Sequence, residues 1–189
     1  ELIDQMDNLP PAAEEPLLLH LGSDAVIRLP EADRLNLWTK LVDLVTKHRK
    51  FSDAKWTMGP EQVDRIAAVA NRLVPDTPAF RNRRLFSERD IDLYEEKGNY
   101  DDQRKKLERR RQEAVLEVAA DGSAQAVLAF AAAVDSPWRV GIAFGVVADS
   151  VVYQVVLPNL VESEDNQLAQ FAGGFVQSRL RVGGWKWVD

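Results

Sequence analysis

Histidine and carboxylate side chains exchange protons near neutral pH, which makes them the first candidates for catalysis. The chain has two histidines, His20 and His48. His48 stands among Lys47, Arg49 and Lys50 at the predicted end of a helix, where cations interact favourably with the last carbonyl groups. We therefore predict that His48 caps that helix on the surface and that His20 is half-buried near another helix end. Neither histidine has a second histidine or a glutamate at the helical spacing of zinc ligands, so no metal site is expected.

A group of acidic residues precedes Gly98, and it consists of Glu88, Asp90, Asp92, Glu95 and Glu96. Asp90 and Asp92 would face the same way if this segment is extended. The segment lacks an Asp-x-Asp-x-Asp-Gly loop, which excludes an EF-hand calcium site and leaves magnesium as an alternative. We interpret the group as a solvated acidic face.

Motifs of nucleophilic and nucleotide chemistry are missing from the sequence. No serine lies in a Gly-x-Ser-x-Gly elbow. There is no Gly-x-x-x-x-Gly-Lys phosphate loop, and no Gly-x-Gly-x-x-Gly follows a predicted strand. We therefore predict that the chain is not an enzyme, has no catalytic residues and binds no cofactor.

Arginine and lysine form the clearest candidate site. Nine cations fall within 31 residues: Arg81, Arg83, Arg84, Arg104, Lys105, Lys106, Arg109, Arg110 and Arg111. Over residues 99–113, six cations face four acids, and helical spacing spreads the positive charge around the helix. We assign all of these cations except Lys106 to a predicted interaction surface for a protein partner. The alternative is phosphate contact with nucleic acid, for which Phe86 and Tyr100 would provide base stacking.

The composition is that of a globular protein. The chain has 189 residues, of which 46% are hydrophobic and 29% charged, and its net charge is −6. The absence of cysteine excludes disulfides and thiolate metal sites, and a cytoplasmic location is expected. The longest apolar stretch, 140–148, is bounded by Arg139 and Asp149 and is too short to span a membrane. Since Glu1 replaces an initiator methionine and tryptophans close the chain, we expect a fragment of a longer polypeptide.

Apolar residues three and four positions apart predict a series of amphipathic helices. Residues 1–22 are expected to form a loose lead-in, with one brief helix at most, ending at Gly22. Residues 75–98 are the least regular part, and Gly122-Ser123 is predicted to be a tight hinge between two antiparallel helices. The predicted long helices occupy about residues 30–50, 60–74, 99–119, 124–134 and 163–183.

Residues 140–157 admit two interpretations. Val140–Val147 and the segment 151–157 are rich in β-branched residues and could form a β-hairpin, which would make the fold α+β. The Ser136-Pro137 helix start and the helical neighbours favour helices instead. We therefore predict an all-α fold of irregular helical hairpins, stacked as a short solenoid or bundle. It would form a single domain over 1–189, with a subdivision near 75–98 as the alternative.

Several segments together resemble known proteins. They are Leu-Trp-Thr-Lys-Leu at 37–41, His-Arg-Lys-Phe-Ser-Asp-Ala-Lys-Trp at 48–56, Arg-Leu-Phe-Ser at 84–87, Asp-Leu-Tyr-Glu-Glu-Lys-Gly at 92–98, and residues 175–187. They resemble helical, HEAT- or tetratricopeptide-like C-terminal segments of large bacterial multidomain proteins, some similar to signal-transduction ATPases with numerous domains. The resemblance covers most of the chain and implies a sensor or scaffold region whose effector lies elsewhere in the parent protein. It carries over no catalytic residue.

We therefore expect a non-catalytic helical scaffold or protein–protein interaction module within a larger bacterial protein. Its partner would be another protein or other domains of the parent chain. The alternative is a helical domain that contacts nucleic acid through the basic clusters at 81–84 and 104–111.

Overall fold

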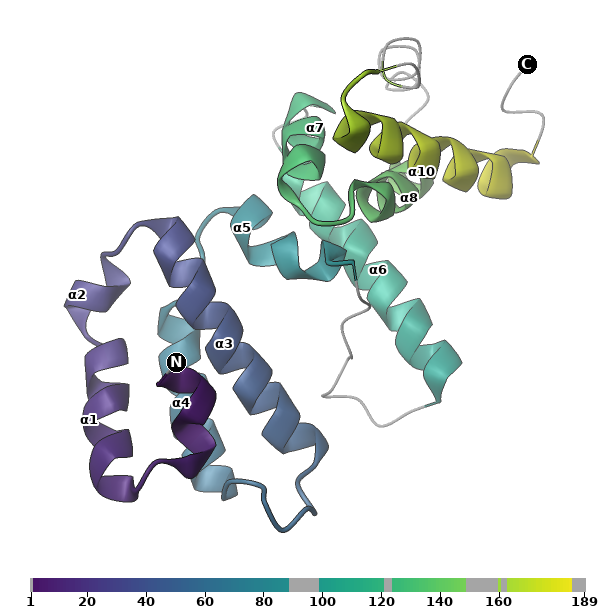
Figure 1. Cartoon of the computed structure of the whole chain (residues 1–189). Helices are drawn as coiled ribbons and strands as arrows, with labels where there is room; N and C mark the ends of the chain where they lie inside the picture. The colour runs from purple at the N-terminus through teal and green to yellow at the C-terminus, as the bar shows by residue number, and fades with distance from the viewer. Residues whose placement is uncertain (1, 89–98, 121–123, 149–159, 161–162, 185–189) are drawn as a thin grey trace. The chain divides into compact units, whose positions relative to one another are not determined.

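The computed structural model describes residues 2–88, 99–120, 124–148, 160 and 163–184, and within these ranges the protein is helical and has no strand (Figure 1). The all-α prediction is therefore confirmed. The chain divides into two compact units between Arg81 and Asn82, inside the irregular stretch 75–98. The first unit consists of residues 1–81 and 93–98, and the second of residues 82–92 and 99–189.

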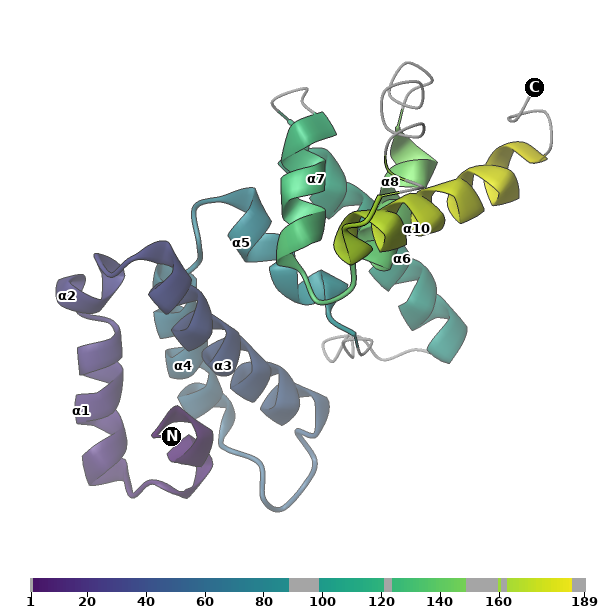
Figure 2. The ribbon, with the colours of Figure 1, turned by 45° about the horizontal axis from the view of Figure 1, so that its top comes forward.

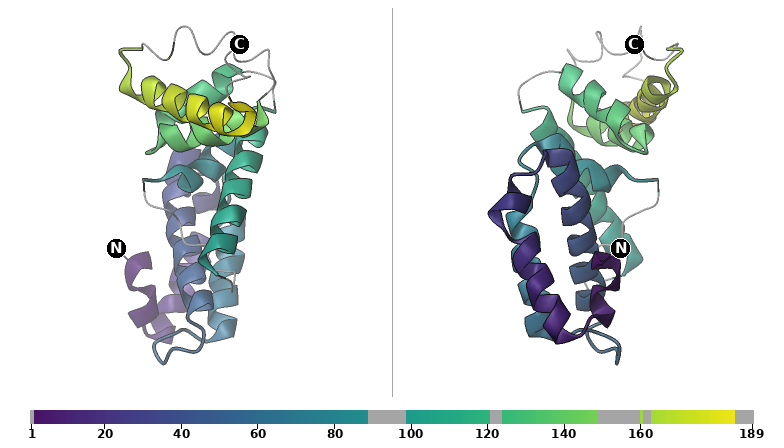
Figure 3. Two further views of the ribbon diagram at one scale, coloured as in Figure 1. Left: turned by 90° about the vertical axis from the view of Figure 1, so that its right-hand side faces the viewer. Right: turned by 60° about the vertical axis from the view of Figure 1, so that its left-hand side comes forward.

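The first unit contains a 3-10 helix and a series of α-helices: η1 (Ile3–Asn8), α1 (Pro11–Leu21), α2 (Asp24–Ile27), α3 (Glu31–Lys50), α4 (Pro60–Arg72) and α5 (Pro78–Asn82, its last residue in the second unit). Helix α4 contacts both α1 and α3, and η1 contacts α3 (Figure 3). The fully buried side chains of Met6, Leu41, Ile66 and Leu73 form the centre of this packing.

Local sequence signals explain where the two long helices of the first unit begin and end. Helix α3 starts directly after Pro30, carries acids in its first turn and ends in Lys-His-Arg-Lys. Helix α4 starts at Pro60, where the missing N–H would have no partner within the helix. The predicted starts of both helices are confirmed, although α4 ends at Arg72, three residues before the proline expected to stop it.

The prediction for residues 1–22 is correct in part. The brief helix expected to end at Gly22 is α1, whereas residues 3–8, expected to be a loose lead-in, form a 3-10 helix. Ion pairs from α3 hold η1 in place: Lys40 with Asp4 at 2.5 Å and Lys47 with Asp7 at 3.1 Å. These tertiary contacts are invisible in a local reading of a proline-rich, acidic segment.

A buried carboxylate also joins α1 to α4. Glu14 is 3% exposed, and it accepts hydrogen bonds from Gln62 at 2.5 Å and from Arg65 at 3.4 Å. A buried carboxylate requires such donors, because its water shell is lost on folding. Glu14 therefore fixes how α1 lies on α4.

The second unit contains η2 (Arg83–Phe86), α6 (Tyr100–Val118), α7 (Ala124–Ala133), α8 (Pro137–Val147) and α10 (Asn166–Gly183). Helices α8 and α10 make the most extensive contact of this unit, and α6 and α7 lie against them (Figure 2). Cap hydrogen bonds mark two helix starts: the start predicted at residue 99 is confirmed, whereas α10 begins at Asn166, three residues after the predicted 163. Asn99 accepts from the N–H of Asp102 at 2.9 Å, and Asp165 accepts from the N–H of Gln167 at 2.8 Å.

Glycines allow the backbones of α8 and α10 to touch. A Cβ atom on Gly141 would overlap the carbonyl oxygen of Phe171, and one on Gly174 would overlap that of Trp138. A Cβ on Gly145 would lie 2.8 Å from the Cβ of Ser178. The glycine pair at 141 and 145 thus serves close packing between two helices of one unit. In the part of the chain that the structure covers, no helix combines the length and apolarity needed to cross a membrane.

The hairpin alternative for residues 140–157 is wrong over Val140–Val147, which are helical in α8. The buried contact with α10 overrides the β-propensity of valine and isoleucine there. Residues 151–157 and the predicted hinge at 122–123 lie outside the described residues.

Candidate functional site

The predicted interaction surface is divided between the two units. Arg81 belongs to α5 in the first unit, whereas the other assigned cations belong to the second unit. In η2, Arg83 is exposed and Arg84 is half-buried. The structure therefore places Arg81 in a different unit from the cations of α6.

Helix α6 exposes four of its five predicted cations: Arg104, Lys105, Arg109 and Arg110. Arg104 lies 3.5 Å from Glu108 in an ion pair one turn apart. The prediction is wrong for Arg111, which is 8% exposed and donates a 2.7 Å hydrogen bond from Nε to the carbonyl of Leu85. Arg111 links α6 to η2, and it is unavailable to a partner.

One outward line of side chains runs along α6, and it consists of Lys105, Arg109, Gln112 and Leu116; we name it the α6 stripe. Arg109, Gln112 and Leu116 follow Lys105 by four, seven and eleven positions, so the four side chains share one face of the helix. The buried residues Leu107, Ala114, Val115 and Val118 occupy the opposite face. Leu116 is 52% exposed, which makes the end of the stripe apolar. Helical periodicity already separates Leu116 from the inward residues, and this signal was available in the sequence.

His48 is buried, which overturns the predicted surface role. It is 1% exposed, and its Nδ1 accepts a 3.1 Å hydrogen bond from the backbone N–H of Met58. Its ring meets the edge of Trp56 at 5.6 Å. Burial lowers the pKa of His48, Lys47 lowers it further, and Asp7 acts in the opposite direction. His48 therefore joins the end of α3 to the segment that leads into α4.

An open pocket of about 710 Å³ lies in the first unit. It is bordered by the end of α2, the first turns of α3, the end of α4 and the segment leading into α5. Its polar lining consists of Arg28, Arg34, Asn71, Arg72, Asp76 and Arg81; we name it the arginine pocket. Of these residues, only Arg81 belongs to the interaction surface predicted from the sequence.

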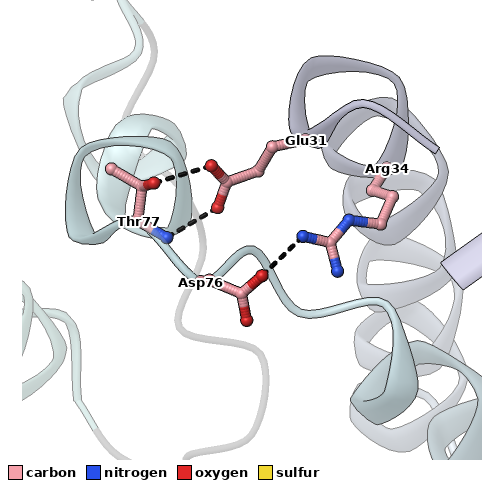
Figure 4. A network of polar contacts seen from close by, with 4 residues as sticks. All are labelled: Glu31, Arg34, Asp76 and Thr77. Atoms are coloured by element: carbon pink, nitrogen blue, oxygen red, sulfur yellow. Dashed lines mark hydrogen bonds and ion pairs between the residues drawn. The ribbon is translucent and has the colours of Figure 1, made fainter. Parts of the chain in front are cut away.

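A polar network of four residues lies beside the arginine pocket (Figure 4), and two of its members, Arg34 and Asp76, line the pocket. Arg34 donates a 2.7 Å hydrogen bond to Asp76. Glu31 accepts two bonds of 2.6 Å, one from the backbone N–H and one from the hydroxyl of Thr77. These bonds from Thr77 hold the pKa of the Glu31 carboxyl below its usual value. The network fixes the chain before α5 against the first turn of α3.

Arg34 is the buried group of this pocket. The residue is 9% exposed, and its Nε has no hydrogen-bond partner. Asp76, its acidic partner, has a side chain that is 86% exposed. One signal for Arg34 was present in the sequence: a cation close to the start of a helix opposes the helix dipole and therefore calls for a nearby anion.

The acidic group proposed as a solvated face lies mainly outside the described residues, because Asp90, Asp92, Glu95 and Glu96 fall in 89–98. Glu88 is exposed. Over the ranges that the structure covers, no three histidine, cysteine, aspartate or glutamate side chains gather closely enough to hold a metal ion.

Comparison of the chain with protein-family models, with curated protein sequences and with solved structures found no match. The α6 stripe and the arginine pocket are therefore the two candidate functional sites of the chain.

Proposed function

We propose that this chain is a non-catalytic helical interaction module that binds a protein partner through the α6 stripe. In keeping with the resemblance described above, the module would belong to a larger bacterial, cytoplasmic protein. The proposal rests on one observation: α6 presents a line of cationic, amide and apolar side chains on the face opposite its packed face. A helix face of this mixed character suits a protein surface better than a uniform polyanion.

The charge pattern defines the partner. Lys105 and Arg109 lie one turn apart on the stripe, and Leu116 follows two turns later. The complementary surface is an amphipathic segment with carboxylates facing the two cations and an apolar side chain covering Leu116. Such a partner would use the charges for orientation and the apolar contact for affinity.

Nucleic acid is the second candidate, and the arrangement of charges in α6 argues against it. Arg111 is buried and Arg104 is paired with Glu108. Asp101, Asp102 and Glu113 are exposed on the same helix. A phosphate backbone would meet these acids together with the cations, which weakens the release of counterions that drives such binding.

Site-specific photocrosslinking tests the proposal in cells of the source organism. A photoreactive phenylalanine analogue at Gln112 is expected to form a discrete, protease-sensitive adduct that nuclease treatment leaves intact. The adduct should disappear in the Lys105→Glu/Arg109→Glu variant. The same analogue at Gln170, an exposed position on α10, serves as the matched control and should form no adduct of that mass.

The proposal is wrong if Gln112 forms no adduct, or if the adduct survives the double charge reversal. A nuclease-sensitive adduct would instead support the nucleic-acid candidate. That candidate also predicts binding of a labelled single-stranded oligonucleotide with steep salt dependence, lost in an Arg109→Glu/Arg110→Glu variant. Arg111 is left unchanged in both variants, because its replacement would disturb the packing of α6 on η2.

A further inference from the structure

We infer that the arginine pocket binds a small molecule that carries a phosphate group. This inference concerns the first unit and is independent of the α6 stripe. The pocket has about 710 Å³ of space, which lies within the range of sites for small ligands. Its opening allows the rest of a ligand to extend beyond the charged end.

The charges around the pocket point to an anion. Among its described lining residues, four are arginines and one, Asp76, carries a carboxylate. This positive cluster occurs in a chain whose net charge is −6, so overall composition does not account for it. Arginine presents planar pairs of N–H donors that match the oxygens of a phosphate, and several guanidinium groups can share one such dianion.

Arg34 provides the second, independent observation. Its guanidinium lies at the pocket wall, 91% of the residue is buried, and Nε has no acceptor. A buried N–H without a partner is unfavourable, so the hydrogen-bonding capacity of Arg34 is incompletely satisfied. The Nε atom itself is covered from solvent, so an oxyanion in the pocket would contact Arg34 through its terminal nitrogens, one of which already donates to Asp76.

Helix capping explains only part of the cluster. Arg28 directly follows α2, and Arg72 is the last residue of α4. Cations are favourable at these carbonyl ends, and Arg72 also lies 3.6 Å from Asp24. Arg81 likewise lies in the last turn of α5, so capping leaves only Arg34, near the start of α3, unexplained. The shared feature of the four is the pocket itself.

Four apolar side chains of the pocket could contact an organic part of the ligand. Ile27, Leu29, Val74 and Pro75 line the pocket beside the arginines. A phosphate ester could place its dianionic group at Arg34 and its carbon skeleton against these apolar side chains. The proposed ligand class is therefore a small phosphorylated metabolite or a pyrophosphate.

The arginine Nε–Hε resonances of the 189-residue chain, uniformly labelled with nitrogen-15, provide the test. The Arg34 resonance is assigned by its loss in Arg34→Lys. Titration with pyrophosphate, at ionic strength held constant with sodium chloride, should shift the Arg34 signal in a saturable way. The control is Arg49, at the other end of α3, which is paired with Asp64 of α4 at 3.1 Å; its resonance should not shift.

Three variants of pocket residues and one control variant, Arg49→Gln, sharpen the test. Arg28→Gln and Arg81→Gln should each weaken pyrophosphate binding by about tenfold, because each removes a charge-assisted donor. Neither residue is buried, so circular dichroism should show an unchanged helical fold. Asp76→Asn should tighten binding, because it removes the negative charge that competes with the ligand for Arg34. Arg49→Gln should leave the affinity unchanged.

The inference is wrong if the Arg34 signal does not shift, or if it shifts equally in sodium chloride alone. It is also wrong if Arg28→Gln and Arg81→Gln together leave binding intact. A titration with citrate, a tricarboxylate, tests the ligand class. If citrate saturates the Arg34 shift at a lower concentration than pyrophosphate does, the pocket recognises carboxylates, and the proposed phosphate ligand is wrong.

Discussion

The two units hold their helices together by different means. In the first unit, large side chains such as Leu41 and Ile66 fill the space between α3 and α4, and polar links join the helix ends. In the second unit, α8 and α10 meet through glycines, and their backbones are in contact. A core filled by side chains is sensitive to lost volume, whereas a backbone contact is sensitive to added volume. The first unit should therefore be destabilised most by removing side-chain volume, and the second by adding it between α8 and α10.

The largest effect is expected from removing volume in the first unit. Ile66 is fully buried against α3, so Ile66→Ala should destabilise that unit by about 2–5 kcal/mol. Native-state hydrogen exchange is the appropriate measurement, because it reports the stability of each unit separately. Faster exchange should be confined to amides of the first unit, and equal acceleration in α8 and α10 would contradict the independence of the two cores.

The reverse change should destabilise the second unit. Gly141→Ala adds one methyl group that must displace the Phe171 carbonyl, and we expect a loss of about 1–3 kcal/mol. Gly173→Ala is the matched control, because a Cβ there meets nothing within 4 Å and alanine favours a helix by roughly 1 kcal/mol. The two substitutions should shift hydrogen exchange in α10 in opposite directions. Stabilisation by both would show that α8 and α10 can separate without loss.

His48 should make the first unit sensitive to acid. The folded state lowers its pKa below 6.5, so the unfolded state binds the proton more readily. The stability that neutral His48 contributes is therefore present above pH 6.5 and is lost as the pH falls below that value towards the folded-state pKa. Hydrogen exchange of the amide of Met58 between pH 7 and pH 5, corrected for intrinsic rates, should report this loss. His48→Gln, which retains an acceptor but does not titrate in this range, should abolish the dependence.

A smaller effect is expected at a helix cap of the second unit. Asp165 accepts hydrogen bonds from the N–H groups of Gln167 and Leu168, so Asp165→Ala should destabilise α10 by about 1 kcal/mol. Asp165→Asn should restore most of this loss, because asparagine is an equally good cap. Exchange of the first amides of α10 would measure it. An equal loss in both variants would assign the effect to charge instead of capping.

Local sequence rules predicted the helices well where the signals are local. Proline at Pro30 and Pro60, the cap at Asn99 and the glycine after Gly183 all lie where the structure begins or ends a helix. Gly184 has a φ of 60°, a conformation that residues with a side chain disfavour, so the glycine itself indicates the end of α10. The same rules missed the 3-10 helix at residues 3–8, which contacts α3.

The candidate sites were less predictable. Runs of like charge drew attention to Arg104–Arg111, yet Arg111 proved to be a structural link. His48 lies among cations in the sequence but under Trp56 in the structure. The arginine pocket collects residues 28, 34, 72 and 81, which are too widely spaced to form a motif.

The order of the residues alone determines most helix starts and the charged character of α6, because each depends on neighbours within one or two turns. The helical state of Val140–Val147 in α8 depends in addition on the contact with α10. Only the packing of helices decides that Glu14, His48 and Arg111 are buried, that glycines bring α8 onto α10, and that four separate arginines meet. Burial and proximity arise when segments distant in the sequence pack together, so they cannot be predicted from a residue's neighbours in the chain.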